Sequence, residues 1–364
     1  MKFRCERDVL LEALSTTGRA VGGRAGNVAL SGLHLELTGD ELRVTGSDLD
    51  LTISQQLTVA GDTDGVVVIP SKLIADIVRA LGPGAVDVVV EGDEVQITAG
   101  RSEFSMRTIP ADDFPRLGSP EGDEVTLNAA DLSDALKQVV KAASSDDSRP
   151  ILTGVLLAAE GEGLRLVSTD SYRLAVRDLP GTSVLSGDQS VLVPSRALAE
   201  LNRVFGENET VALRLGERDA SFEVGGTQVV TRLIEGEFPN YRGLIPDTYP
   251  NELTVNRSEL LDAVRRVRLM AQEATPIRLN MRADTLELVA VTQDVGQAHE
   301  AVEEAAYKGD DLTVAFNPEY LIDGIEVAPG DEITLETVDE LKPALLKSSE
   351  DPNFLYLLMP VRVS

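Results

Sequence analysis

The sequence predicts an α+β protein of three similar domains, each with two helices on antiparallel sheets. The same order of elements recurs about every 125 residues along the 364-residue chain. Short segments in each copy alternate apolar and polar residues, which is typical of half-buried strands. Other segments carry apolar residues at helical spacing. At about 100 to 200 residues per domain, the length also fits three domains, each able to bury its own core.

Each repeat opens with a short strand, a turn and an amphipathic helix. Leu14, Leu136 and Val264 occupy the same position of the pattern in the three copies. Acidic residues lie in the first helical turn and basic residues in the last, an arrangement that favours the helix dipole. The three copies span residues 3–21, 125–144 and 253–271.

The second part of each repeat is a hairpin-like pair of strands. Alternation is clearest in the segments LHLEL, LRLVS and LELVA. Turn residues separate the two strands of each copy: Gly39 and Asp40, then Gly161 to Gly163, then Ala283 and Asp284. The copies span residues 27–53, 149–176 and 275–302.

The third part is a strand, a helix and further strands. A proline and a capping-type residue stand at each corner between strand and helix, in the segments IPSK, VPSR and FNPE. Each repeat then holds two helices and roughly eight strands. Proline, glycine and polar residues interrupt the pattern near residues 119–122 and 246–251. These interruptions predict domains at residues 1–120, 121–248 and 249–364.

The charge is unevenly distributed along the chain. The net charge is −28, yet the six predicted helices carry 10 basic and 11 acidic side chains, which leaves −27 on the rest. If the helices share one face, that face is the only plausible surface for a polyanion, and the acidic remainder would repel it. The helices are predicted at residues 8–20, 72–81, 131–144, 196–205, 258–271 and 318–327.

The basic side chains of these helices are the candidate phosphate contacts. Bases near helix C-termini also satisfy the helix dipole without any ligand, so that alternative stays open. Arg24 lies in a glycine-rich segment after the first helix, where it could reach a phosphate or form a plain turn. The helical candidates are Arg19, Lys72, Arg79, Lys137, Lys141, Arg196, Arg203, Arg265, Arg266 and Arg268.

Several classes of protein are disfavoured by composition. Cys5 is the only cysteine and His34 and His299 are the only histidines, so neither a disulfide nor a zinc site is expected. No apolar run approaches the roughly 20 residues that span a bilayer, and the N-terminus lacks a signal-peptide core. We therefore expect a soluble cytoplasmic protein with no cofactor and no membrane partner.

An enzyme is the main alternative, and the sequence gives it little support. Neither a phosphate-binding loop ending in Gly-Lys-Ser/Thr nor a Gly-Xaa-Ser-Xaa-Gly nucleophile motif is present. Carboxylate pairs such as Asp48 with Asp50, or Asp146 with Asp147, are typical of solvated turns. A second alternative is an acidic repeat scaffold that binds peptide motifs without encircling DNA.

Segments throughout the chain resemble the bacterial DNA polymerase III beta subunit, the sliding clamp family. The matching segments are MKFRCERDVLLEAL, GGRAG, GRSEFSMRTIPADDFPRL, TDSYRLAV, GEFPNYRGLIP, FNPEYLID and YLLMPVRV. The resemblance implies a homodimer closed head to tail as a ring around double-stranded DNA, with helices lining the hole. It implies a processivity factor rather than an enzyme. Its partners would be the replicative polymerase, the clamp loader and repair proteins, which dock through short linear peptides.

The resemblance also implies a peptide-binding pocket and a subunit interface. Ser171 and Tyr172 replace the commoner Gly-His pair of the family pocket, which bears on peptide preference. Phe104 and Met106 would pack on Leu269 and Met270 of the partner. Arg24 matches a family position near DNA. The implied pocket residues are Leu152, Thr169, Ser171, Tyr172, Arg173, Leu174, Pro239, Leu244, Leu357, Met359, Pro360 and Val361.

Overall fold

The computed structural model of the protein describes residues 1–22, 27–112, 114–115, 118, 120–272, 275–283 and 285–362. Arg24 therefore lies outside the described residues, as do Ser119 of the first predicted domain boundary and Asp284 of the third predicted hairpin turn. The chain forms two compact units, each described here by itself. One comprises residues 1–130 and 196–233, and the other residues 131–195 and 234–364.

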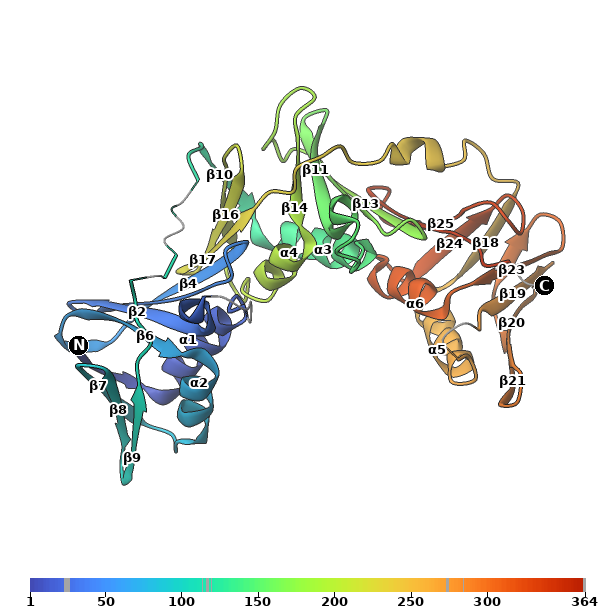
Figure 1. Ribbon diagram of the computed structural model, residues 1–364. Helices are drawn as coiled ribbons and strands as arrows, with labels where there is room; N and C mark the ends of the chain where they lie inside the picture. Colours follow the sequence, from blue (N-terminus) through green and yellow to red (C-terminus); the bar gives the residue numbers. More distant parts are fainter. Residues whose placement is uncertain are drawn as a thin grey trace. The chain divides into compact units, whose positions relative to one another are not determined.

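The elements follow the predicted order three times (Figure 1). In the first repeat they are β1 (Lys2–Glu6), α1 (Arg7–Gly18), η1 (Val28–Ser31), β2 (Gly32–Thr38), β3 (Glu41–Ser47), β4 (Leu51–Thr58), β5 (Ala60–Thr63), β6 (Gly65–Pro70), α2 (Ser71–Ala80), β7 (Ala85–Glu91), β8 (Glu94–Ala99) and β9 (Ser102–Arg107).

The second repeat lacks a counterpart of β5 among its described residues, but otherwise keeps the order. Its elements are β10 (Glu124–Asn128), α3 (Ala129–Val139), η2 (Val140–Ala142), η3 (Pro150–Thr153), β11 (Gly154–Glu160), β12 (Gly163–Thr169), β13 (Arg173–Leu179), β14 (Ser190–Pro194), α4 (Ser195–Asn202), β15 (Thr210–Leu215), β16 (Asp219–Val224), β17 (Thr227–Arg232) and η4 (Tyr241–Leu244).

The third repeat completes the described chain. Its elements are β18 (Asn251–Asn256), α5 (Arg257–Arg268), β19 (Ile277–Arg282), β20 (Thr285–Thr292), β21 (Gly296–Val302), β22 (Ala306–Lys308), β23 (Leu312–Phe316), α6 (Pro318–Val327), β24 (Glu332–Thr337), β25 (Ala344–Ser348) and β26 (Phe354–Leu358).

Two details of the sequence prediction were wrong. The hairpin-like segments each contain a third strand, β4, β13 or β21, because a turn reverses the chain once more. At the first of these turns the Asp48 carboxylate accepts hydrogen bonds from the backbone N–H groups of Asp50 (3.1 Å) and Leu51 (2.8 Å). The other error concerns helix ends, since α1 stops at Gly18 and Arg19 is its C-cap.

Each unit holds two antiparallel sheets. The unit of residues 1–130 and 196–233 contains the order β5-β1-β7-β8-β9 and the larger order β10-β15-β16-β17-β4-β3-β2-β6. The other unit contains β14-β11-β12-β13-β26-β25-β24-β18-β22 and β21-β20-β19-β23. Both larger sheets join strands of consecutive repeats, although the apolar core that contains Phe3, Leu14 and Met106 is built from the first repeat alone.

Helices pack on these sheets through the apolar faces that the sequence pattern predicted. Leu14, Leu136 and Val264 are each no more than 1% exposed, which confirms their common position in the repeat. In the first unit α1 and α2 lie against each other and cover strands β2, β3 and β4 (Figure 1). In the second unit α5 and α6 pack together. No described helix is long and apolar enough to span a membrane.

Gly46 permits the close approach of α1 to β3, and this yields a prediction. A Cβ atom at Gly46 would lie 2.1 Å from the Thr17 carbonyl oxygen, so Gly46→Ala must displace the helix. We expect a loss of about 1–3 kcal/mol of unfolding free energy, seen as a lower first transition in thermal unfolding followed by circular dichroism. The control is Gly82→Ala, where nothing lies within 4 Å. Equal shifts in the two variants would contradict the packing argument.

Candidate functional site

Strand pairing across a repeat boundary organises the first unit. β4 of the first repeat pairs antiparallel with β17 of the second, from Leu51 opposite Thr231 to Gln55 opposite Thr227. The Arg232 N–H and the Thr231 hydroxyl both donate to the Asp50 carbonyl, at 3.0 and 3.1 Å. We call this arrangement the first junction. It makes one continuous sheet from two repeats.

An ion cluster joins the helices beside the first junction. Arg19, at the end of α1, donates to Glu200 of α4 at 2.6 Å, and Arg203 donates to the same carboxylate at 2.7 Å. Arg196 pairs with Asp48, whose side chain is only 6% exposed. Three arginines against two carboxylates leave the cluster with a net charge of +1.

The Asp48 carboxylate is stabilised in its charged form. Burial alone would raise the pKa of this carboxyl, but the hydrogen bonds from Arg196 and from the Leu51 and Asp50 amides outweigh burial and hold the pKa below the ordinary value. A buried carboxylate with a charged donor and two backbone donors fixes the turn before β4.

The second unit contains an equivalent second junction. β13 of the second repeat pairs antiparallel with β26 of the third, from Arg173 opposite Leu358 to Arg177 opposite Phe354. Beside it, Lys141 of η2 contacts Asp323 (3.3 Å) and Glu326 (2.6 Å) of α6. Arg265 of α5 also reaches Glu326, at 2.9 Å.

Arg173 is the centre of the second junction. Its guanidinium, with a side chain only 10% exposed, pairs with Asp170 at 3.1 Å and with Asp323 at 2.6 Å. It also lies 4.4 Å from the ring centroid of Tyr320, a distance suited to a cation–π contact. Tyr172 stacks against Tyr320 with ring centroids 6.3 Å apart. The buried ion pairs of Arg173 thus lie beside an exposed aromatic side chain, that of Tyr172, at the rim of the second junction.

Several of the predicted pocket residues meet at this junction. Leu174 and Leu357 are directly paired and buried, and the Met359 N–H donates to the Tyr172 carbonyl at 2.9 Å. Phe238 and Tyr241, on either side of Pro239, pack against the same apolar cluster as Leu174 and Leu357. Leu152 and Thr169 are also buried, whereas Ser171, Pro239 and Leu244 are exposed and Pro360 and Val361 are half-buried.

The turn of the predicted pocket is strained. Ser171 has a φ of +82°, a conformation that favours glycine, and the same position in the first repeat, Leu49, has a φ of +81°. The Thr169 hydroxyl accepts the Ser171 N–H at 3.1 Å, and Asp170 accepts the Tyr172 and Arg173 N–H groups at 2.9 and 3.0 Å. These bonds hold Tyr172 outward, with 58% of its surface exposed.

Comparison with known proteins gives a consistent result along the whole chain. Family models for the N-terminal, central and C-terminal domains of the DNA polymerase III beta subunit match residues 1–118, 126–240 and 242–362. The chain belongs to this family. Among curated relatives, the beta sliding clamp of Streptomyces coelicolor is 33% identical over all of both chains. That of Staphylococcus aureus is 31% identical, over all of this chain and 99% of its own.

Solved structures of the DNA polymerase III beta subunit family share the fold. The DNA polymerase sliding clamp from Bacillus subtilis has a TM-score of 0.91 at 28% identity, over all of both chains. The DnaN sliding clamp from Bartonella birtlesii, in a structure bound to griselimycin, has a TM-score of 0.93 at 29% identity, again over all of both chains. The predicted family and its three-repeat fold are thereby confirmed.

Most predicted DNA-contacting bases of this beta-subunit chain already have acidic neighbours. Besides those at the two junctions, Arg79 pairs with Asp76 (2.7 Å) and Lys137 with Asp134 (2.8 Å), in both cases on an exposed helix face. Arg266 pairs with Glu300, and Arg268 with Glu319. Lys72 is exposed and has no ion-pair partner among the described residues.

The predicted subunit-contact residues differ in exposure. Leu269 is 82% exposed, Phe104 is 38% exposed and Met270 is half-buried, as an interface would require. Met106, by contrast, is 6% exposed and packs in the core of the first unit. Phe104 and Met106 lie on the same face of β9, opposite Ile97 and Val95, so the alternation of the strand does not account for their different exposure.

The acidic residues that pair with bases at the two junctions were not predicted from the sequence. Glu200 and Asp323 occupy the same position in α4 and α6, four residues after Arg196 and Glu319. That correspondence was the available signal, but nothing local indicates which distant base each acid meets. No described group of three or more His, Cys, Asp or Glu side chains could hold a metal ion.

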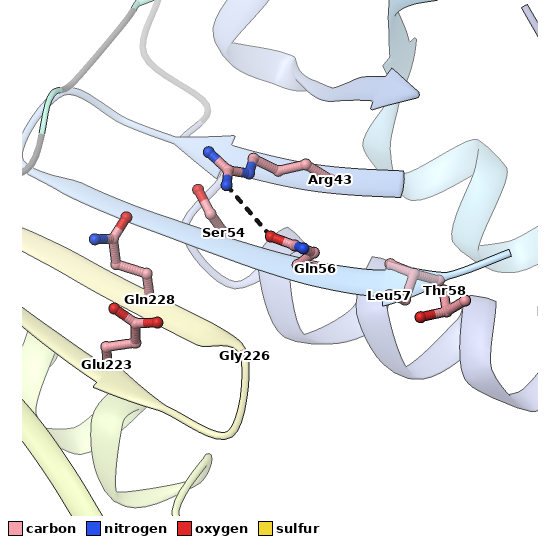
Figure 2. Close-up of a pocket in the computed structure, with 8 residues that line it drawn as sticks. All are labelled: Arg43, Ser54, Gln56, Leu57, Thr58, Glu223, Gly226 and Gln228. Carbon is pink, nitrogen blue, oxygen red and sulfur yellow. Dashed lines mark hydrogen bonds between the residues drawn. The ribbon is translucent and has the colours of Figure 1, made fainter. Parts of the chain in front are cut away.

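A hollow of about 450 Å³ also lies on the exposed face of the first junction (Figure 2). Its lining is mostly polar, and Arg43 donates to Gln56 at 3.3 Å across neighbouring strands. Ser54 of β4 and Gln228 of β17 are opposite one another in the strand register and both line the hollow. The hollow is therefore lined by residues of both the first and the second repeat, outside the apolar core.

The first junction generates a prediction about pH. Asp48→Asn keeps an acceptor for the backbone amides but loses the charge opposite Arg196, so we expect a loss of about 1 kcal/mol of unfolding free energy near pH 7. The folded pKa is lowered, so the carboxylate's contribution is complete above the ordinary pKa of 3.8 and disappears as pH falls through the lower folded value.

Urea unfolding of the two proteins between roughly pH 7 and pH 3 measures this difference. The gap between Asp48→Asn and the unsubstituted chain should narrow at the acid end. Asp134→Asn is the matched control, because its partner Lys137 is on the same exposed helix. A gap that stays constant with pH would contradict the assignment.

Proposed function

We propose that this chain is a DNA sliding clamp: two copies close head to tail into a ring around duplex DNA and tether the replicative polymerase for processive replication. The observation that carries the proposal is the repetition of one junction. Strand pairing of the same kind joins the first repeat to the second and the second to the third. A structure that reuses one heterologous interface closes into a ring when its rotation allows.

The strands left over at the two ends of the series support closure by a second copy. β21 is the third-repeat equivalent of β4 and β13, and it is the edge strand of its sheet. β9 is the first-repeat equivalent of β17 and β26, and it too is an edge strand. An unpaired edge offers free backbone N–H and C=O groups to another chain. Pairing β21 with β9 of a partner would satisfy both edges.

Binding of duplex DNA is supported by the distribution of charge. The helices are almost neutral in a chain of net charge −28. Exposed ion pairs contribute little stability, so bases such as Arg79 and Lys137 can exchange a carboxylate for a phosphate at small cost. Contacts of this kind carry no sequence information. A ring that slides needs such weak and interchangeable contacts, and no covalent chemistry.

The rim of the second junction supports peptide docking. Tyr172 (58% exposed), Leu244 (48%) and Met359 (38%) expose apolar surface on the unit that also contains the paired Leu174 and Leu357. Aromatic and methionine side chains are enriched in such sites because they give large, adaptable contact area. The polymerase, the clamp loader and repair proteins would bind here through short linear peptides. Tethering then raises the local concentration of polymerase at the primer end.

Topological retention tests the ring. Loaded by its cognate clamp loader onto a nicked circular plasmid, the protein should remain bound through gel filtration at high salt, and linearising the plasmid should release it within the same run. Weak charge contacts alone cannot survive high salt. Equal retention on circular and linear DNA would overturn enclosure and favour ordinary binding. Loss from both would favour a scaffold that never encircles DNA.

Peptide docking is tested separately. Tyr172→Ala and Met359→Ala should each weaken binding of a peptide from the polymerase's clamp-binding segment by about fivefold or more, since truncating a central apolar contact costs over 1 kcal/mol. Fluorescence anisotropy with labelled peptide gives the dissociation constant. Leu341→Ala is the control, because Leu341 is 51% exposed but outside the predicted pocket. The same loss in all three variants would contradict the assignment.

A further inference from the structure

The second helix of the third repeat differs in charge from its two counterparts, and the difference yields an inference that rests on the proposed binding of DNA. We propose that α6 competes internally with DNA: its three carboxylates hold basic side chains of neighbouring helices, and a phosphate must displace these carboxylates to reach the bases. The second helix of the third repeat would then oppose DNA binding, and its counterparts in the first two repeats would favour it.

The strand-to-helix corners IPSK, VPSR and FNPE identify equivalent charged positions in the three second helices. Counting from the last residue of each corner, the first, fifth and eighth positions are charged in every repeat. Two bases and one acid give +1 in each of the first two repeats, whereas three acids give −3 in the third. The three sets are Lys72, Asp76 and Arg79, then Arg196, Glu200 and Arg203, then Glu319, Asp323 and Glu326.

The spacing places the three acids of α6 on one side of the helix, because residues at i, i+4 and i+7 share a face. In the first repeat the last base pairs with the acid three residues before it, Arg79 with Asp76 at 2.7 Å, and the equivalent pair of the second repeat has the same distance. Such an internal pair is impossible in α6, where Asp323 and Glu326 have the same charge. Residues 318–327 contain no lysine or arginine, so the bases must come from other elements.

Two neighbouring elements supply bases to the second and third acids of α6. Lys141 of η2 contacts Asp323 at 3.3 Å and Glu326 at 2.6 Å. Arg265 of α5 reaches Glu326 at 2.9 Å. The hydrogen bond from Lys141 lowers the pKa of Glu326 and outweighs burial, which would raise it, so the carboxyl is charged at neutral pH. A phosphate that binds Lys141 must therefore replace two carboxylates.

The first acid of α6 takes a third base. Glu319 pairs with Arg268, the last residue of α5, and the two side chains are about half exposed. Lys141, Arg265 and Arg268 were all predicted as phosphate contacts, and each is now held by an acid of one helix. Three bases against three acids leave no net charge in this group, whereas the cluster beside the first junction keeps +1.

The charge left behind makes release of these bases unfavourable. If the bases around α6 turned towards DNA, the helix would present three unpaired carboxylates to the phosphates. If Arg79 did the same, α2 would present only Asp76, and Lys72 on the same helix would offset it. Like charges repel, and the repulsion grows with the number of unpaired acids. α6 therefore opposes a polyanion more strongly than α2 does.

Two of the three acids can be changed without disturbing the second junction. Asp323 also pairs with Arg173 at 2.6 Å, so it is left in place. The side chains of Glu319 and Glu326 are 54% and 39% exposed, and in the described part of the chain their ion pairs are with the three helix bases alone. Glutamine at these positions keeps the shape of the side chain and removes its charge.

Binding to a short fluorescent duplex tests the competition. Glu319→Gln and Glu326→Gln should each tighten binding by about two- to fivefold at low salt, the size of one exposed ion pair. Each base that is released adds a phosphate contact, so the slope of log Kd against log salt should steepen by about 0.9 per base. Fluorescence anisotropy over a salt series measures both quantities.

Glu340→Gln is the matched control. Glu340 belongs to the same repeat, is exposed, and has no ion-pair partner among the described residues. Its substitution removes the same charge from the chain but releases no base, so it should leave the salt slope unchanged. Glu319→Lys combined with Glu326→Arg gives α6 the charge pattern of α2 and should produce the largest gain in affinity.

A second round of substitution identifies the released bases. Lys141→Gln combined with Arg265→Gln should weaken duplex binding little in the unsubstituted chain, because Glu326 already holds both bases. In the Glu326→Gln background the same two substitutions should remove most of the gain, since interacting positions are not additive. A gain that survives the loss of both bases would overturn the release of bases and leave only a general effect of charge.

The outcomes separate this inference from the proposed ring. Suppose that the chain is retained on circular plasmid but Glu319→Gln and Glu326→Gln bind duplex no better than Glu340→Gln does. Competition by α6 is then overturned and the ring stands. If the unsubstituted chain and every variant fail both to bind duplex and to remain on circular plasmid, the two fall together. Binding of the polymerase peptide should not change in any of these variants, because Arg173 keeps its contact with Asp323.

Discussion

The fold depends on one interaction above all, the antiparallel pairing of a strand from one repeat with the last strand of the next. β4 with β17 and β13 with β26 convert separate repeats into continuous sheets. The backbone N–H and C=O groups of an edge strand must form hydrogen bonds with another strand or with water. Pairing within the chain therefore removes an exposed edge that could otherwise lead to aggregation. The register is fixed at one end by the turn residue with positive φ and at the other by the backbone bond of Ile234 or Val361. The same register therefore recurs at both junctions.

The ion clusters beside these junctions explain the positions of several basic residues in this strongly acidic chain. Counting charges along the helices assigns Arg19 and Arg196 to phosphate contact, yet both are already engaged at the first junction, with Glu200 and Asp48. Arg19 is 29% exposed and Glu200 12%, so removing either partner would leave a poorly solvated charge. The two roles are compatible because the first cluster has one arginine more than it has carboxylates. At the second junction Lys141 and Arg265 share acids that balance them.

Local pattern predicted the helices well, because apolar spacing and corner chemistry are properties of neighbouring residues. α6 begins and ends at the predicted residues 318 and 327, and the other helices begin one or two residues early. What the pattern could not supply was pairing at long range: Arg19 and Glu200 are 181 residues apart, and nothing beside either residue identifies the other. The third strands β4 and β13 were missed because the turns before them are closed by the side chains of Asp48 and Asp170 rather than by glycine. The burial of Met106 was missed because family resemblance assigns a contact to a residue without saying how deeply its side chain lies in the core.

The pairing of bases with acids has a consequence for how a proposed ring would hold DNA. When a base already has a carboxylate at 2.7 or 2.8 Å, as Arg79 and Lys137 do, a phosphate must displace that partner, and the net gain is the difference between two similar contacts. A surface of this kind binds the polyanion weakly at any one position and equally at the next. Long residence on DNA then cannot come from the contacts themselves. It must come from enclosure, which lasts only as long as the junctions of the ring stay closed. The junction between two separate chains would have the least charged helix contact, at Leu269.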